Sequence, residues 1–189
     1  MPLAKHRVCP VQHAGALSFS LRKIIQPPRR ILAPFISPGM TVLDFGAGPG
    51  FFTLEMARLV GESGKVIAAD LQAGMLAKLR LKIQHTDLES LITLHQTEAD
   101  TINLPAKVDF ALLFYVLHEL PDQAAFFHEL KTCLQPGGQI LLVEPKWHVS
   151  SREFQNSLDL LRHAGFEILP GSKIFFSRTA VARTNSAPF

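Results

Sequence analysis

The chain has few cysteines: only Cys9 and Cys133 occur among its 189 residues, and they lie far apart. They form no CxxC pair, so the sequence disfavours a disulfide framework and a cysteine-based zinc site. Low cysteine usage fits a reducing, intracellular setting. For Cys9 we weigh a reactive thiol near an active-site lid against a packed or solvent-facing residue, and the second interpretation is favoured.

The sequence also lacks long runs of apolar or basic residues. Its longest apolar run, Phe110–Leu117, is far too short to cross a membrane, and residues 1–15 contain no apolar core of a signal peptide. Formal net charge is +3, with lysines and arginines scattered along the chain. We therefore expect a cytoplasmic protein with no membrane partner and no nucleic-acid partner.

What the sequence does contain is a glycine-rich turn in the stretch Thr41–Phe52. Thr41–Phe45 has the residues of a short buried strand, and Phe52–Val60 has apolar residues at helical spacing. Between them lie Gly46, Gly48 and Gly50, which permit positive φ and close approach of a ligand. Strand, glycine turn and helix in this order indicate a ligand-binding βα turn, with a tight turn lacking any ligand as the alternative.

The remaining pattern alternates strands and helices and predicts one α/β domain. We expect strands at Thr41–Phe45, Lys65–Ala69, Leu91–Gln96, Val108–Val116, Ile140–Glu144, Phe166–Leu169 and Ile174–Arg183. We expect helices at Ala14–Ile25, Arg29–Pro34, Phe52–Val60, Gln72–Gln84 and Ser150–Ala164, and one with Pro121 and Asp122 in its first turn. The PGS turn at residues 170–172 is too short for a parallel crossover. The sequence therefore predicts a doubly wound, seven-stranded, mostly parallel sheet with an antiparallel C-terminal strand.

Three acids fall where the first three strands end. Asp44 precedes the first glycine, Asp70 closes the second strand and Asp100 follows the third. In doubly wound sheets, ligands bind at the carboxyl ends of the strands, and an acid after the second strand often bonds ribose hydroxyls. We favour this role for Asp70 over a helix N-cap.

Five segments together resemble the class I methyltransferases that use S-adenosylmethionine, a family with a Rossmann-like fold. They are VLDFGAGPGFFT (42–53), VIAAD (66–70), EADTINLP (98–105), FYVLHELPD (114–122) and LKTCLQPGGQILLVEP (130–145). The resemblance covers roughly Met40 to Arg183 and is strongest to small bacterial and archaeal members. It implies S-adenosylmethionine as cofactor and a methyltransferase activity.

The resemblance also implies roles for residues around the glycine turn. Gly46, Ala47 and Gly48 are expected under the methionine part of the cofactor, with Asp44 holding the loop and the cofactor's amino group. Asp70 is expected to take both ribose hydroxyls.

Four further positions are assigned by the same resemblance. Leu71 is expected to pack on the adenine, and Asp100, with Thr101 beside it, to accept from the adenine amino group. Phe114 is expected to line the methyl-donor end. The alternatives are a loop-capping acid for Asp100 and an ordinary core residue for Phe114.

The acceptor side carries weaker signals. His118 and Glu119 follow the fourth predicted strand, where the family places acceptor-orienting groups, and we take them as candidate catalytic residues. Glu144 and His148 follow the fifth strand at the same edge. These four side chains have the chemistry to hold a metal, but their spacing does not demand one, and we predict no metal site.

The expected organisation has three parts: a helical leader or lid at residues 1–39, a cofactor-binding methyltransferase domain at 40–183, and a frayed tail at 184–189. We expect a monomer or homodimer acting on a small-molecule acceptor. Two alternatives stay open: a cofactor-binding protein without catalysis, and an NAD(P)-dependent oxidoreductase. The second is disfavoured by the short chain and the missing third glycine of GxGxxG.

Overall fold

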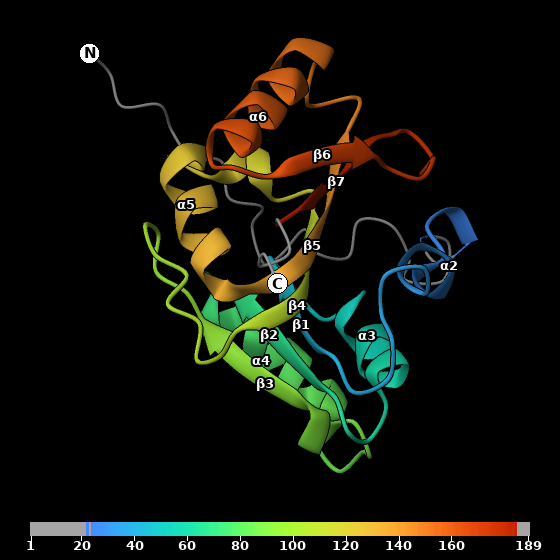
Figure 1. Cartoon of the computed structure of the whole chain (residues 1–189). Coiled ribbons are helices and arrows are strands. Elements are labelled where there is room, and N and C mark those ends of the chain that lie inside the picture. The colour runs from blue at the N-terminus through green and yellow to red at the C-terminus, as the bar shows by residue number, and fades with distance from the viewer. Residues whose placement is uncertain (1–21, 23, 185–189) are drawn as a thin grey trace.

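The computed structural model describes residues 22 and 24–184, which form a single seven-stranded sheet with helices on both faces (Figure 1). The strand order is β3-β2-β1-β4-β5-β7-β6, with β1 to β5 parallel and β7 antiparallel to both of its neighbours. The strands are β1 (Thr41–Phe45), β2 (Lys65–Asp70), β3 (Ile92–Gln96), β4 (Val108–Phe114), β5 (Leu134–Pro145), β6 (Glu167–Pro170) and β7 (Ser177–Arg183). The predicted fold class is confirmed.

The helices form two layers, one on each face of the sheet. One layer holds α5 (Gln123–Cys133) and α6 (Ser151–His163), packed on one core cluster. The other holds α2 (Pro28–Leu32), α3 (Thr53–Val60) and α4 (Ala73–Ile83), packed on a second cluster. Two single-turn 3₁₀ helices, η2 (Glu89–Leu91) and η3 (Leu117–Glu119), lie in the connections.

The central strands are apolar at successive positions because both of their faces are covered. In β1, Leu43 belongs to the cluster under α5 and α6, whereas its neighbour Val42 belongs to the cluster under α3 and α4. The same division holds in β4 for Ala111 and Leu112. Since successive side chains of a strand point to opposite faces, a continuous apolar run is the signature of such a doubly covered strand.

Several predicted boundaries need correction. β4 ends at Phe114 rather than Val116, because Tyr115 has φ 61°, which breaks the extended backbone. α5 begins at Gln123: Asp122 is extended and caps the helix by accepting from the Ala125 N–H at 2.9 Å, so neither it nor Pro121 is in the first turn.

The fifth and seventh predicted strands also begin at other residues than predicted. β5 begins at Leu134 rather than Ile140, since Leu134 pairs with Val108 before the register shifts across the following glycines. β7 begins at Ser177 rather than Ile174, because Phe176 has φ 52° and turns the chain. The predicted leader helix falls largely on residues 1–21 and 23, outside the described residues, as do Cys9 and most of the tail.

Candidate cofactor and acceptor site

The turn between β1 and α3 is built on three glycines with positive φ. Gly46, Gly48 and Gly50 have φ of 73°, 54° and 84°. A Cβ on Gly46 would lie 2.7 Å from the Val116 side chain, and one on Gly50 would lie 2.4 Å from Leu79. Close packing therefore demands glycine at both of these positions.

Gly48 differs from its two neighbours, because a Cβ added there would meet no atom within 4 Å. Its N–H donates to Asp70 Oδ2 at 2.8 Å, and the other oxygen of Asp70 accepts from the Gln72 N–H at 2.8 Å. Burial raises the pKa of Asp70, and the two N–H donors counteract this rise. Asp70 therefore ties the glycine turn to the carboxyl end of β2 beside an open space.

Asp44 lies deeper, at 3% exposure, and accepts a hydrogen bond from the Thr53 hydroxyl at 2.6 Å. Burial raises the pKa of Asp44 to about 6, and the nearby Asp70 adds to the rise, while Thr53 and Arg22 oppose it. Two carboxyl groups held out of water attract a cationic ligand, which would lower both pKa values on binding.

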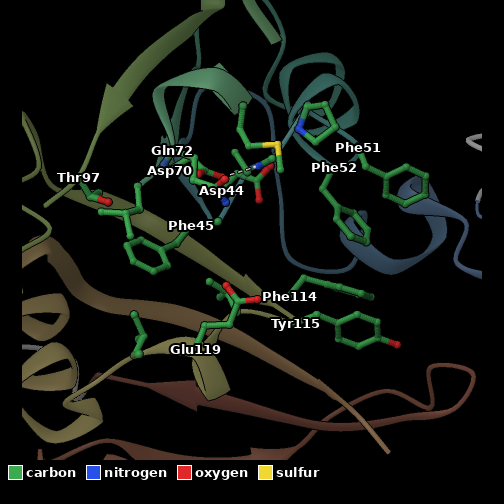
Figure 2. A pocket seen from close by; sticks show the side chains of 18 of the residues that line it. Asp44, Phe45, Phe51, Phe52, Asp70, Gln72, Thr97, Phe114, Tyr115 and Glu119 are labelled. Atoms are coloured by element: carbon green, nitrogen blue, oxygen red, sulfur yellow. Dashed lines mark hydrogen bonds between the residues drawn. The ribbon is translucent and has the colours of Figure 1, made fainter. Parts of the chain in front are cut away.

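These acids line one wall of a cavity of about 880 Å³. In Figure 2, Asp44, Asp70 and Gln72 lie together on that wall, and Phe114, Tyr115 and Glu119 lie on the opposite one. We call the first wall the donor end. It is lined by Asp44, Gly46, Ala47, Gly48, Asp70, Leu71, Gln72, Met75, Thr97, Glu98 and Ala99.

The opposite wall, which we call the acceptor end, is mostly aromatic. Tyr115 is its centre: its ring packs on Phe114 with centroids 4.4 Å apart and edge-on against Trp147 at 5.4 Å. The Tyr115 hydroxyl accepts from Gln26 Nε2 at 2.8 Å and lies 2.6 Å from Ser177 Oγ. The wall is completed by Ile25, Phe51, Phe52, Val116, Glu119, Leu120, Pro121, Phe175 and Phe176.

The segment before α2 also reaches the cavity. Arg22, Ile25 and Gln26 line it, and the Arg22 guanidinium lies 4.1 Å from the centroid of the Phe51 ring. These three residues belong to the predicted lid at residues 1–39, of which the structure describes residues 22 and 24–39.

Not all predicted site residues line the cavity. Asp100 is exposed, and the Thr101 hydroxyl donates to Glu129 at 2.8 Å. Neither residue lines the cavity. The residues of this loop that do line it are Thr97, Glu98 and Ala99. The roles predicted for Asp100 and Thr101 stay predictions, and they need a shift of the loop after β3.

Of the two candidate catalytic residues, only one lines the cavity. Glu119 lines the cavity, whereas His118 points to the buried Glu144, with His118 Nδ1 and Glu144 Oε2 2.5 Å apart. Burial alone would lower the pKa of His118, but Glu144 raises it above its ordinary value. The His148 ring packs edge-on against His118 at 4.7 Å. Within the described part of the chain, no three His, Cys, Asp or Glu side chains gather as metal ligands would.

The donor end fits a cofactor that combines a ribose diol with positive charge. Asp70 has free acceptor capacity for hydroxyls, the space over Gly48 admits close approach, and Asp44 and Asp70 favour a cation. The same acids would repel a pyrophosphate. The fold and this site together define an α/β enzyme of the kind that binds S-adenosylmethionine.

The sequence profile of the methyltransferase domain family matches residues 42–138, slightly more than half of the chain, so the chain belongs to this family. The prediction of a class I S-adenosylmethionine-dependent methyltransferase is confirmed. A C-methyltransferase of ubiquinone and menaquinone biosynthesis, UbiE of Shewanella oneidensis, is 32% identical over 108 residues. That match covers 57% of this chain and 43% of the relative, so it spans less than half of the curated protein's length.

Two solved structures superpose on nearly the whole chain. An S-adenosylmethionine-dependent methyltransferase from Aquifex aeolicus superposes with a TM-score of 0.80 at 26% identity, covering 93% of this chain and 98% of that one. A methyltransferase structure from Methanococcus maripaludis gives 0.73 at 17% identity, covering 100% and 99%, and supports the fold. These findings do not favour the oxidoreductase alternative.

Proposed function

We propose that this methyltransferase acts on a small, apolar, ring-bearing acceptor. The observation that carries the proposal is the acceptor end of the cavity, where aromatic rings surround Tyr115. Flat aromatic side chains bury large apolar area and stack on planar ligands. UbiE of Shewanella oneidensis bears the name of a C-methyltransferase of quinone biosynthesis, and a quinol-like ring suits this wall.

We propose that the residues of the donor end bind the cofactor in the following way. Asp70 would accept from the ribose hydroxyls while it keeps its bonds to Gly48 and Gln72. Gly46 to Gly48 would lie under the methionine part, Asp44 would attract its ammonium group, and Leu71, which is 41% exposed and lines the cavity, would cover the adenine.

Bound S-adenosylmethionine would supply an electrophilic methyl group. The chain's own contribution is to hold the acceptor in line and to exclude water, which together supply much of the rate of a displacement reaction. Methyl transfer leaves one proton to be removed: the hydroxyl proton when the hydroxyl oxygen takes the methyl group, or the proton of the methylated carbon when a ring carbon takes it. Glu119 lines the acceptor end and is the group that we assign to receive this proton.

His118 would act on Glu119 only indirectly. Glu144 accepts from the Leu117 N–H at 3.1 Å as well as facing His118, so the pair fixes η3, which ends in Glu119. We propose His118 as a positioning residue rather than one that touches the acceptor.

The N-terminal segment would serve as a lid over the acceptor end. Gln26 and Arg22 lie on the cavity wall and are tied to it through Tyr115 and Phe51. The division into a lid at 1–39, a catalytic domain at 40–183 and a tail remains part of this proposal.

The test is turnover with a panel of acceptors, measured as release of S-adenosylhomocysteine. We expect turnover with quinols and apolar phenols, and none with tRNA or polar amines of similar size. Glu119→Gln should lower kcat with little change in cofactor affinity. Turnover of tRNA, or of none of the phenols and quinols, would refute the proposed acceptor class.

A further inference from the structure

Three aromatic side chains lie exposed on two adjoining loops where the cavity meets the surface. Trp147, Phe175 and Phe176 are 65%, 62% and 56% exposed, although each also lines the cavity. The Phe176 ring lies 6.4 Å from Trp147 and 5.4 Å from Phe175. We call these three residues the aromatic rim.

The backbone of the two loops keeps the rim exposed, although one of its residues has a strained backbone conformation. The Lys146 N–H donates to the Phe176 carbonyl at 3.0 Å, which joins the two loops. Phe176 has φ 52°, a conformation that bulky side chains rarely adopt. A strained phenylalanine with more than half of its surface exposed adds little to folding stability, so its placement points to a function.

Charge near the rim identifies the partner that it fits. Lys146 precedes Trp147 and Lys173 lies two residues before Phe175, and both lysines are exposed. Aromatic rings beside lysines suit the interface of an anionic bilayer, where the rings enter the headgroup layer and the cations meet phosphates.

We propose that the aromatic rim inserts into the surface of an anionic lipid bilayer, which places the mouth of the cavity against the membrane. No helix in the described part of the chain is long and apolar enough to cross a bilayer. The expectation of no membrane partner rested on the lack of such a span, and a surface contact needs none. Delivery of an apolar acceptor from the bilayer rests on the proposed function; the lipid contact itself does not.

Trp147 is the chain's only tryptophan, so its fluorescence reports on the rim alone. The test mixes the full chain with vesicles of phosphatidylglycerol and phosphatidylcholine, and with vesicles of phosphatidylcholine only. We expect the Trp147 emission to shift to the blue, and the protein to sediment with the vesicles, in the anionic case. Brominated lipids should quench the shifted emission.

Substitutions in and near the aromatic rim test whether the rim is responsible for binding to the vesicles. The double variant Phe175→Ser, Phe176→Ser should bind anionic vesicles at least tenfold more weakly, whereas Leu81→Ser, at a 68% exposed position on α4 outside the cavity, should bind normally. Lys146→Gln and Lys173→Gln should each weaken binding about fivefold. Phe176→Gly removes one ring together with the strained φ, so it should weaken binding without lowering the melting temperature.

Four results would overturn the proposal. They are no binding to anionic vesicles, equal binding by the serine variant, equal binding to neutral vesicles, and an emission already blue-shifted without lipid. The last would mean that residues 1–21 or a second copy of the chain covers the rim, and sedimentation velocity distinguishes these two. Vesicle binding without turnover of any apolar acceptor would refute the proposed function alone.

Discussion

The donor end of the cavity is made of carboxylates and backbone N–H groups, whereas the acceptor end is made of aromatic rings. Most of the donor end comes from β1, the glycine turn and the end of β2 with the start of α4, and Thr97 to Ala99 join it from the loop after β3. The acceptor end gathers Tyr115, Trp147 and Phe176 from three loops far apart in sequence. The first arrangement suits a fixed, charged cofactor, and the second suits an acceptor that differs between relatives.

The largest expected effect is at Gly48, where the donor end is open. Gly48→Val would place a branched side chain in the cavity, and we expect S-adenosylhomocysteine affinity to fall about 100-fold or more, which is about 2.7 kcal/mol. Isothermal titration calorimetry measures this loss. Gly61→Val is the matched control, since Gly61 also has positive φ and open space but does not line the cavity. Equal affinity losses in both variants would show that strain, rather than blockage, is responsible.

Asp70 is the next most sensitive position. Asp70→Ala should weaken cofactor binding by about 1–3 kcal/mol, because hydroxyl partners and the tie to Gly48 are lost together. Asp109→Ala is the control: Asp109 accepts from the Thr41 N–H at 2.8 Å away from the cavity, so this change should cost stability only. Unchanged affinity in the Asp70 variant would remove this residue from the site.

Ionised Asp44 lowers the stability of the fold but favours cofactor binding, and measurements at different pH values separate these two effects. Its pKa is raised from 3.8 to about 6, so the folded state resists ionisation, and stability is lost as pH rises between these values. Asp44→Asn should therefore raise the free energy of unfolding at pH 7, by at most about 3 kcal/mol.

The same variant should bind S-adenosylhomocysteine less tightly, by about tenfold, since it loses the charge that faces the ammonium group. Wild-type affinity should rise with pH through about 6, and the variant should lose this dependence. Calorimetry from pH 5 to 8 with thermal unfolding at the same pH values tests both effects. A variant that is less stable and binds as before would contradict this account.

The smallest effect on the cofactor is expected at the acceptor end. Tyr115→Phe keeps the ring and removes the bonds to Gln26 and Ser177, so acceptor KM should rise about fivefold, equivalent to about 1 kcal/mol. The affinity for S-adenosylhomocysteine should change less than twofold. A larger loss of cofactor affinity than of acceptor affinity would mean that the two ends are not separate sites.

The same division explains what the sequence could predict. The β1 run and its three glycines are neighbours along the chain, and Asp70 closes the next strand, so local pattern was enough to predict that these residues share one edge of the sheet. Thr97, Glu98 and Ala99 were not predicted to line the cavity, because they lie on the loop after β3. Thr53 was missed as the partner of Asp44, although it is the first residue of α3. The signal available in the sequence was a hydroxyl side chain shortly after a buried acid.

The acceptor end could not be predicted, because it depends on the antiparallel pairing of β5 with β7. That register sets Pro145 opposite Ser177 and so brings the loops of Trp147 and Phe176 together. Tyr115 gave no sequence signal of its positive φ, since non-glycine residues rarely adopt it. The predicted adenine contact of Asp100 depends on the conformation of a loop, which residue spacing does not determine.

The most direct test of a two-ended cavity is a crystal structure with S-adenosylhomocysteine bound. We predict its ribose hydroxyls within hydrogen-bonding distance of Asp70 and its amino acid part over Gly46 to Gly48, with the space beside Tyr115 and Trp147 left open. A ribose away from Asp70, or a cofactor lying against Trp147, would contradict the assignment of the two ends.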